Sequence, residues 1–127
     1  MRKFRIVWRR VKVKRKKGNA LEYKKYKEAA RNLADNRISY YNKLYGFAVN
    51  GVAIKNAKTR WGSCSKKGNL NFNYKIALLP EAMADYVIVH ELCHLGEFNH
   101  SKKFWDLVGV AIPNHKLLRK KIQNIKL

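Results

Sequence analysis

The sequence has few acidic residues, few cysteines and no long apolar run. Only eight Asp plus Glu stand against 29 Lys plus Arg in 127 residues, which gives a formal net charge of +21 at pH 7. An excess of this size favours contact with a polyanion such as nucleic acid, although a basic host proteome would account for it equally well. The charge alone therefore names no substrate.

Two cysteines, Cys64 and Cys93, are too few for a disulfide framework, so we expect both to be reduced. No stretch approaches the ~20 consecutive apolar residues that a membrane-spanning helix needs. The first residues also lack the apolar core and cleavage site of a signal peptide. We therefore expect no membrane association and a cytoplasmic location.

The chain length corresponds to about one domain, and a hydrophobic content of 46% is sufficient for a folded core. Residues 1–17 carry ten Lys or Arg and no acid. Within them Phe4, Ile6 and Trp8 alternate with basic residues, which predicts a strand with one basic face or an arm that binds nucleic acid. We divide the chain into a basic N-terminal strand or arm, residues 1–19, and a main domain, residues 20–127.

The main domain is predicted to begin with helical and then extended segments. Apolar residues recur at threes and fours over residues 21–45, which predicts a long amphipathic helix that ends at Gly46. Strands are expected near residues 49–54, 58–64 and 69–76, with a hairpin turn at residues 65–68. Leu70, Phe72 and Tyr74 alternate with asparagines, so we expect a small antiparallel sheet with one buried face.

The second half is predicted to be helical. Residues 82–95 are apolar nearly all round, which is typical of a helix buried at the centre of a domain. Gly96 is placed to end that helix, and Ser101 and Asn114 can begin two C-terminal helices. The fold class expected from these segments is α+β, with a buried central helix.

The buried helix contains the sequence His90-Glu91-Leu92-Cys93-His94. Two histidines four residues apart project from one face of a helix and can bind one metal ion. Two core histidines satisfied by hydrogen bonds would be the alternative. Burying two imidazoles and a carboxylate in so apolar a helix is costly without a strong partner, and a divalent cation supplies one.

A catalytic zinc site commonly has three protein ligands and one water. His100 is the favoured third ligand, because Gly96 lets the chain turn back toward the helix before Ser101. The competing donors are Glu97, His115, Asp85 and Asp106. We accordingly expect one Zn²⁺ held by His90, His94 and His100 together with a water molecule.

Glu91 is offset by about 100° from its neighbouring histidine around the helix axis, so its carboxylate is expected beside the metal and not on it. There it can act as general base toward the attacking water and return the proton to the leaving amine. A salt bridge on a solvated face is the alternative role, and this helix offers almost no such face.

Three blocks of sequence resemble the YgjP-like zinc metallopeptidases, a family within the zincin group. They are residues 58–65 with 68–73 (KTRWGSCS and GNLNFN), residues 86–95, and residues 99–101 followed by Phe104 and Trp105. The resemblance extends over about residues 21–127 and implies a minimal zincin-like fold. It also implies that His90, His94 and His100 are metal ligands and that Glu91 is the catalytic base.

Two features depart from patterns known in related proteins. The region before the long helix is shorter than is usual in the YgjP-like family, and a part that restricts substrate access is expected to be missing. The spacing of His94 and His100 equals that of metzincins, but Glu97 stands where metzincins have glycine. We therefore do not assign the chain to the metzincins.

The resemblance further implies that the strand with Arg60 and Trp61 lies beside the metal helix, where an extended substrate could pair with a sheet edge. Arg60 and Trp61 are therefore candidate substrate-binding residues. For Trp61 and Cys64 a role in the core is the favoured interpretation, and Cys93 is interpreted as core packing because a fourth protein ligand would close the site.

The sequence thus favours a zinc-dependent peptidase that acts on peptide or protein substrates. Two alternatives stay open. One is a basic nucleic-acid-binding domain with a structural metal, although no known nucleic-acid-binding motif is present. The other is a metal-dependent phosphohydrolase that acts on nucleotides. The sequence gives no oligomeric state.

Overall fold

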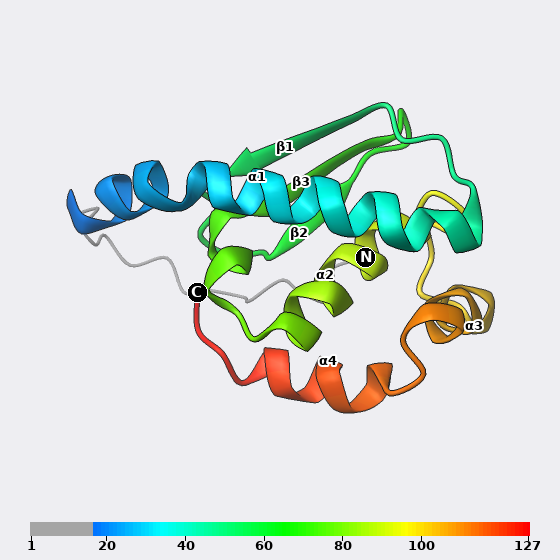
Figure 1. The fold of residues 1–127 in the computed structure, drawn as a ribbon. Helices are drawn as coiled ribbons and strands as arrows, with labels where there is room; N and C mark the ends of the chain where they lie inside the picture. Colours follow the sequence, from blue (N-terminus) through cyan, green and yellow to red (C-terminus); the bar gives the residue numbers. More distant parts are fainter. Residues whose placement is uncertain (1–16) are drawn as a thin grey trace.

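The computed structural model describes residues 17–127, and residues 1–16, which include most of the expected basic strand or arm, lie outside the described residues (Figure 1). The fold class is α+β, as expected. The elements in chain order are helix α1 (Lys17–Tyr45), strands β1 (Gly51–Lys55), β2 (Gly62–Cys64) and β3 (Asn69–Asn73), the 3-10 helix η1 (Tyr74–Leu78), and helices α2 (Glu81–Cys93), α3 (Lys102–Ala111) and α4 (His115–Gln123).

Helix α1 begins earlier than predicted. It starts at Lys17, inside the expected N-terminal arm of residues 1–19, and it ends before Gly46, whose φ of 73° is the left-handed conformation that closes many helices. Ala30, Ala34 and Ile38 form its buried face. Leu44, one of the apolar residues from which the amphipathic helix of residues 21–45 is predicted, is instead 58% exposed.

The three-stranded sheet has the order β1-β3-β2 and is mixed. The predicted hairpin is confirmed, because β2 and β3 pair in antiparallel fashion through a turn in which Gly68 has a φ of 90°. The expectation of a purely antiparallel sheet is wrong at β1, which pairs with β3 in parallel. β3 inserts between its two predecessors, and alternation along single strands does not reveal such an insertion.

Strand β3 is shorter than predicted because Asn73 ends it. The Asn73 side-chain oxygen accepts a hydrogen bond from the Lys75 backbone N–H and caps η1, so Tyr74 lies in the 3-10 helix. The amide of Asn73 also donates to the carbonyl oxygens of Ala57 and Arg60, at 2.8 and 3.2 Å. These bonds explain why Asn73 is buried although the alternation placed it on the solvated face.

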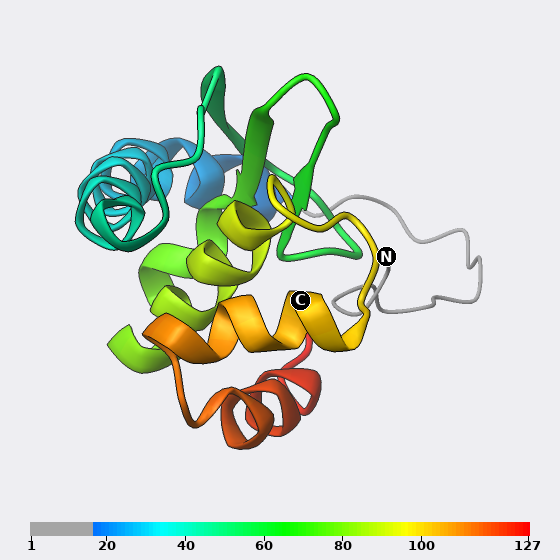
Figure 2. The ribbon, with the colours of Figure 1, turned by 90° about the vertical axis from the view of Figure 1, so that its right-hand side faces the viewer.

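Helix α2 lies at the centre of the molecule. It contacts α1, α3, α4, β2 and β3, and residues 83–93 of the helix are all buried. Figures 1 and 2 show α1 and the sheet on one side of α2, with α3 and α4 on the other. The prediction of a helix buried nearly all round is confirmed. No helix of the described residues is long and apolar enough to cross a membrane.

The two C-terminal helices begin where the sequence indicated. The Ser101 hydroxyl accepts a hydrogen bond from the Phe104 backbone N–H and caps α3. Asn114 precedes α4 without making such a side-chain bond. Phe104 and Leu118 are buried, so both helices cover the core next to α2.

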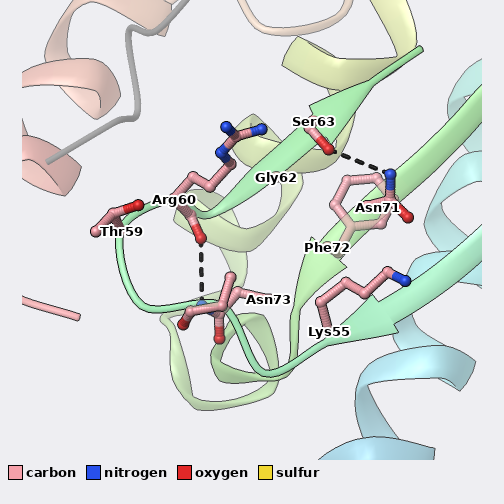
Figure 3. A pocket seen from close by; sticks show the side chains of 9 residues that line it. Lys55, Thr59, Arg60, Gly62, Ser63, Asn71, Phe72 and Asn73 are labelled. Atoms are coloured by element: carbon pink, nitrogen blue, oxygen red, sulfur yellow. Dashed lines mark hydrogen bonds between the residues drawn. The ribbon is translucent and has the colours of Figure 1, made fainter.

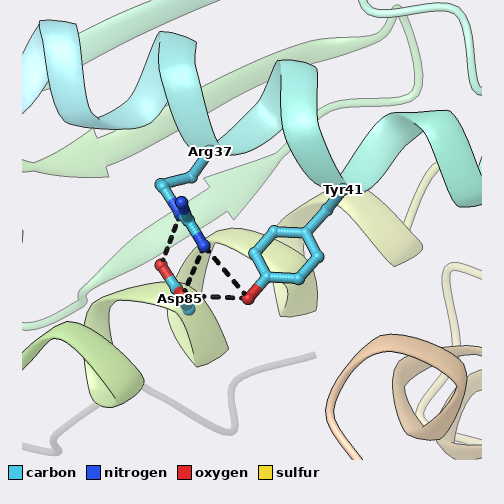
Figure 4. A network of polar contacts seen from close by, with 3 residues as sticks. All are labelled: Arg37, Tyr41 and Asp85. Carbon is cyan, nitrogen blue, oxygen red and sulfur yellow. Dashed lines mark hydrogen bonds and ion pairs between the residues drawn. The ribbon is translucent and has the colours of Figure 1, made fainter.

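A polar network joins α1 to α2 (Figure 4). The Arg37 guanidinium donates two hydrogen bonds of 3.0 Å to the Asp85 carboxylate, and the Tyr41 hydroxyl donates a third of 2.9 Å. The hydrogen bond with Asp85 raises the pKa of Arg37, and burial raises the pKa of Tyr41. Both donors therefore keep their protons at neutral pH, and Asp85 has partners although it is buried.

Arg37→Ala should lower the free energy of unfolding by about 1–3 kcal/mol, because the buried Asp85 carboxylate loses its charged partner. Chemical denaturation measures the change. Lys102→Ala is the matched control: the Lys102–Asp106 pair is exposed, so its loss should change stability by less than about 0.5 kcal/mol. Equal effects of the two substitutions would contradict the role of the network.

Candidate metal centre

Helix α2 presents two imidazoles on one face. His90 and His94 are one helical turn apart and are 1% and 0% exposed. Their Nε2 atoms lie 3.2 Å from each other. The Nε2 atoms of the two rings therefore converge on a common point.

The third imidazole comes from the segment between α2 and α3. The Nε2 atom of His100 lies 3.2 Å from that of His90, and one nitrogen from each of the three rings falls within 4.8 Å of the others. Nitrogens bound to a tetrahedral zinc ion at about 2.0–2.1 Å are separated by about 3.3 Å. The separations of His94 and His100 from His90 thus match the edge of a zinc coordination tetrahedron.

Hydrogen bonding and stacking fix the ring orientations. The Nδ1 atom of His94 donates to the Glu97 carbonyl oxygen at 3.0 Å, which assigns the proton to Nδ1 and leaves the Nε2 lone pair for a cation. Phe104 stacks on the His94 ring at 4.4 Å, and Trp105 stacks on the His100 ring at 5.9 Å. Side chains of helix α3 therefore support the rings of His94 and His100.

The turn after α2 depends on Gly96, as predicted, but for a different reason. Gly96 has no positive φ. A Cβ atom at this position would lie 2.8 Å from the Phe47 ring and 3.1 Å from Leu107. Close packing of the turn against Phe47 therefore requires glycine and brings His100 back toward α2.

Glu91 lies against strand β2 and is 1% exposed. A Cβ atom on Gly62 would approach the Glu91 side chain to 2.9 Å and the Asn71 carbonyl oxygen to 3.0 Å. The Glu91 charge also contributes, after burial, to raising the pKa of Cys64 to about 12. The carboxylate thus sits in a gap that exists because position 62 has no side chain.

The competing donors named from the sequence do not join the histidine cluster of the described residues. Asp85 is bound by Arg37, and Asp106 pairs with Lys102. Glu97 contributes its backbone carbonyl to His94, and His115 stacks on Trp105 with ring centroids 5.2 Å apart.

The cysteines also lie outside the cluster. Cys93 is buried, and burial raises its pKa to about 12, so it is a thiol at neutral pH. Cys64 is partly buried and is likewise a thiol. Neither cysteine belongs to the group of potential metal ligands in the described residues, and the burial of Cys93 fits its interpretation as core packing.

Arg60 and Trp61 occupy different environments at the start of β2. Trp61 is 3% exposed and belongs to the hydrophobic core. Arg60 is partly exposed and lines a pocket next to the sheet. The sequence did not reveal the roles of Gly62, the Glu97 carbonyl or the stacking by Trp105. Only Gly62 had a signal in the sequence, because a glycine inside a strand indicates the close approach of another group.

Three convergent imidazoles with an adjacent buried carboxylate define a metallohydrolase type of site, and the comparisons with known proteins agree. The chain belongs to the YgjP-like metallopeptidase domain family, whose model matches residues 2–125. The match is longer than the resemblance seen in the sequence, because it includes the basic N-terminal segment. A comparison with curated proteins finds no significant match.

Two solved structures have a similar fold. One is the metallopeptidase zymogen abylysin of Pyrococcus abyssi, with a TM-score of 0.60, 24% identity, and coverage of 73% of this chain and 90% of that chain. The other is the metallopeptidase zymogen jannalysin of Methanocaldococcus jannaschii, with a TM-score of 0.57, 23% identity, and coverage of 73% and 92%. At these identities the likeness concerns the fold.

Gly62→Ala should lower the free energy of unfolding by about 1–3 kcal/mol, because the new methyl group overlaps Glu91 and the Asn71 backbone. Gly109→Ala is the control, since its methyl group would meet His115 at an ordinary 3.7 Å. That substitution should leave stability unchanged or raise it slightly. A Gly62→Ala protein as stable as the control would contradict the close approach of β2 to Glu91.

Proposed function

We propose that the protein is a zinc-dependent peptidase in which His90, His94 and His100 bind one ion and Glu91 is the general base. The observation that carries the proposal is the convergence of three Nε2 atoms, with those of His94 and His100 each 3.2 Å from that of His90. Three neutral nitrogen donors suit zinc, and a three-ligand set leaves a coordination position for water. A zinc ion held there would polarise the scissile carbonyl and lower the pKa of the attacking water.

Glu91 is suited to move the proton. Its carboxylate belongs to the residue next to a ligand but is not part of the histidine cluster, so it can accept a proton from the attacking water. It then donates this proton to the nitrogen of the leaving amine as the carbon–nitrogen bond breaks. Close packing against Gly62 limits the movement of the buried carboxylate, which favours proton transfer in a fixed geometry.

The edge strand β2 is suited to hold the substrate. An extended peptide can add to an exposed sheet edge through main-chain hydrogen bonds. In the three-stranded sheet β2 is an outer strand and lies next to Glu91. We assign Arg60, which precedes this edge strand, to substrate binding, and Trp61 next to it to a buried supporting position.

His100→Ala should lower zinc affinity at least about 100-fold, more than the loss of an outer hydrogen-bond partner usually costs. Competition with a chromophoric chelator measures the affinity. His115→Ala is the matched control, because this fourth histidine stacks on Trp105 outside the cluster. A His100→Ala protein that binds zinc as tightly as the control would remove His100 from the ligand set.

Glu91→Gln should retain one zinc ion per chain and lower kcat for peptide hydrolysis about 100- to 10,000-fold, because the amide cannot accept the proton. Metal analysis and a fluorogenic peptide assay give the two values. Glu97→Gln serves as control, since Glu97 acts on His94 through its backbone carbonyl. Full turnover by a verified zinc-loaded Glu91→Gln protein would refute the assigned base.

A further inference from the structure

A polar pocket of about 270 Å³ lies beside the sheet, and none of the three histidines lines it (Figure 3). Successive residues of a strand point to opposite faces. Leu70 and Phe72 are buried in the core, so Asn71 and its cross-strand partner Ser63 project from the other face. The pocket is formed on this second face, between the strands and the loop of residues 56–61.

The lining of the pocket has positive charge only. Lys55 and Arg60 contribute two cations, Thr59, Ser63 and Asn71 contribute polar groups, and none of the lining residues is acidic. Figure 3 shows the Arg60 and Lys55 side chains extending in different directions from the two sides of the pocket, with the hydrogen-bonded pair Ser63 and Asn71 at another edge. Such a set of donors suits a carboxylate or another anion.

Hydrogen bonds fix the shape of the pocket before any ligand binds. The Asn71 amide donates to the Ser63 hydroxyl oxygen at 3.2 Å, which leaves the hydroxyl proton of Ser63 for a ligand. The Asn73 amide bonds the Ala57 and Arg60 carbonyl oxygens and so ties the loop to the end of β3. A preformed pocket binds at a lower ordering cost.

Gly62 links the pocket to the metal centre. One side of this residue faces Glu91, and the residue also lines the pocket. A peptide paired with the edge of β2 would send its side chains alternately to the two faces of the sheet. A residue next to the one that faces Glu91 would therefore reach the pocket.

We propose that this pocket is a subsite for an acidic side chain, Asp or Glu, of the peptide substrate, and that the enzyme selects acidic peptides. The inference rests on the proposed peptidase function. The formal charge of +21 acts in the same direction, because it attracts acidic polypeptides over long range. A peptide carboxylate is favoured over a nucleic-acid phosphate, because Gly62 belongs both to the pocket and to the strand beside Glu91. A peptide bound along that strand would therefore place a side chain in the pocket.

The test measures binding apart from cleavage. Fluorescence anisotropy is recorded with zinc-loaded Glu91→Gln protein and labelled alanine-rich nonapeptides in which one Glu is moved through successive positions, each paired with a Gln peptide. At one position the Glu peptide should bind about 10-fold more tightly than its Gln counterpart, as expected for a hydrogen-bonded charge pair.

Adding Arg60→Gln or Lys55→Gln should bring that ratio close to 1. Adding Lys67→Gln, which removes an exposed cation of the hairpin turn outside the pocket, should preserve it. Circular dichroism confirms that each variant is folded. The proposal is overturned if no position shows a preference for Glu, or if the preference survives in both pocket variants.

Two further readings separate the possible failures. A single-stranded oligonucleotide of twelve thymidylates is added as a competitor. If it displaces the peptide only while Arg60 and Lys55 are present, and the Glu and Gln peptides bind alike, the pocket binds phosphate and the assignment is overturned. Hydrolysis of the same peptides by the wild-type protein is assayed separately. An intact Glu preference without hydrolysis supports the subsite and contradicts the peptidase function, whereas hydrolysis without a preference does the reverse.

Discussion

The structure depends on one constraint: its central helix is buried on all sides and yet carries two imidazoles and a carboxylate. Such groups are costly inside a protein unless they have strong partners. Here the three imidazoles converge, because the Nε2 atoms of His94 and His100 each lie 3.2 Å from the Nε2 atom of His90. A cation at that place would turn an unfavourable cluster into a stabilising one.

The rest of the fold arranges itself around that helix. The Arg37–Asp85 ion pair holds α1 against α2. The small sheet places β2 close to Glu91, because Gly62 of this strand has no side chain. On the other side the tight turn at Gly96 and the capped helix α3 return His100 to the cluster. A short chain is sufficient for this site, because the elements that pack on α2 also position its functional groups.

Much of this could be predicted from the sequence, and the reasons are physical. His90, Glu91 and His94 lie within one helical turn, so their relation follows from helix geometry alone. The hairpin, the Ser101 cap and the end of α1 at Gly46 likewise depend on local chemistry. Segments of this kind are read correctly because few distant contacts act on them.

The features that sequence reasoning missed depend on tertiary contacts. The parallel pairing of β1 with β3 arises from an insertion between strands, and Asn73 is buried because it bonds a loop 13 to 16 residues away. Gly96 was expected to let the chain turn back through its backbone freedom, whereas the close contact with Phe47 explains why this position requires glycine. In each case a distant segment of the chain decides the outcome, and local periodicity carries no record of it.

The central claim is that three imidazole nitrogens bind one ion that keeps an open position. X-ray absorption spectroscopy of the zinc-loaded protein at the zinc edge tests it most directly. The account predicts four light-atom ligands at about 2.0–2.1 Å, with imidazole scattering from three of them and the fourth exchangeable for a small anion. A sulfur ligand at about 2.3 Å, or a fourth protein ligand that no anion displaces, would contradict it.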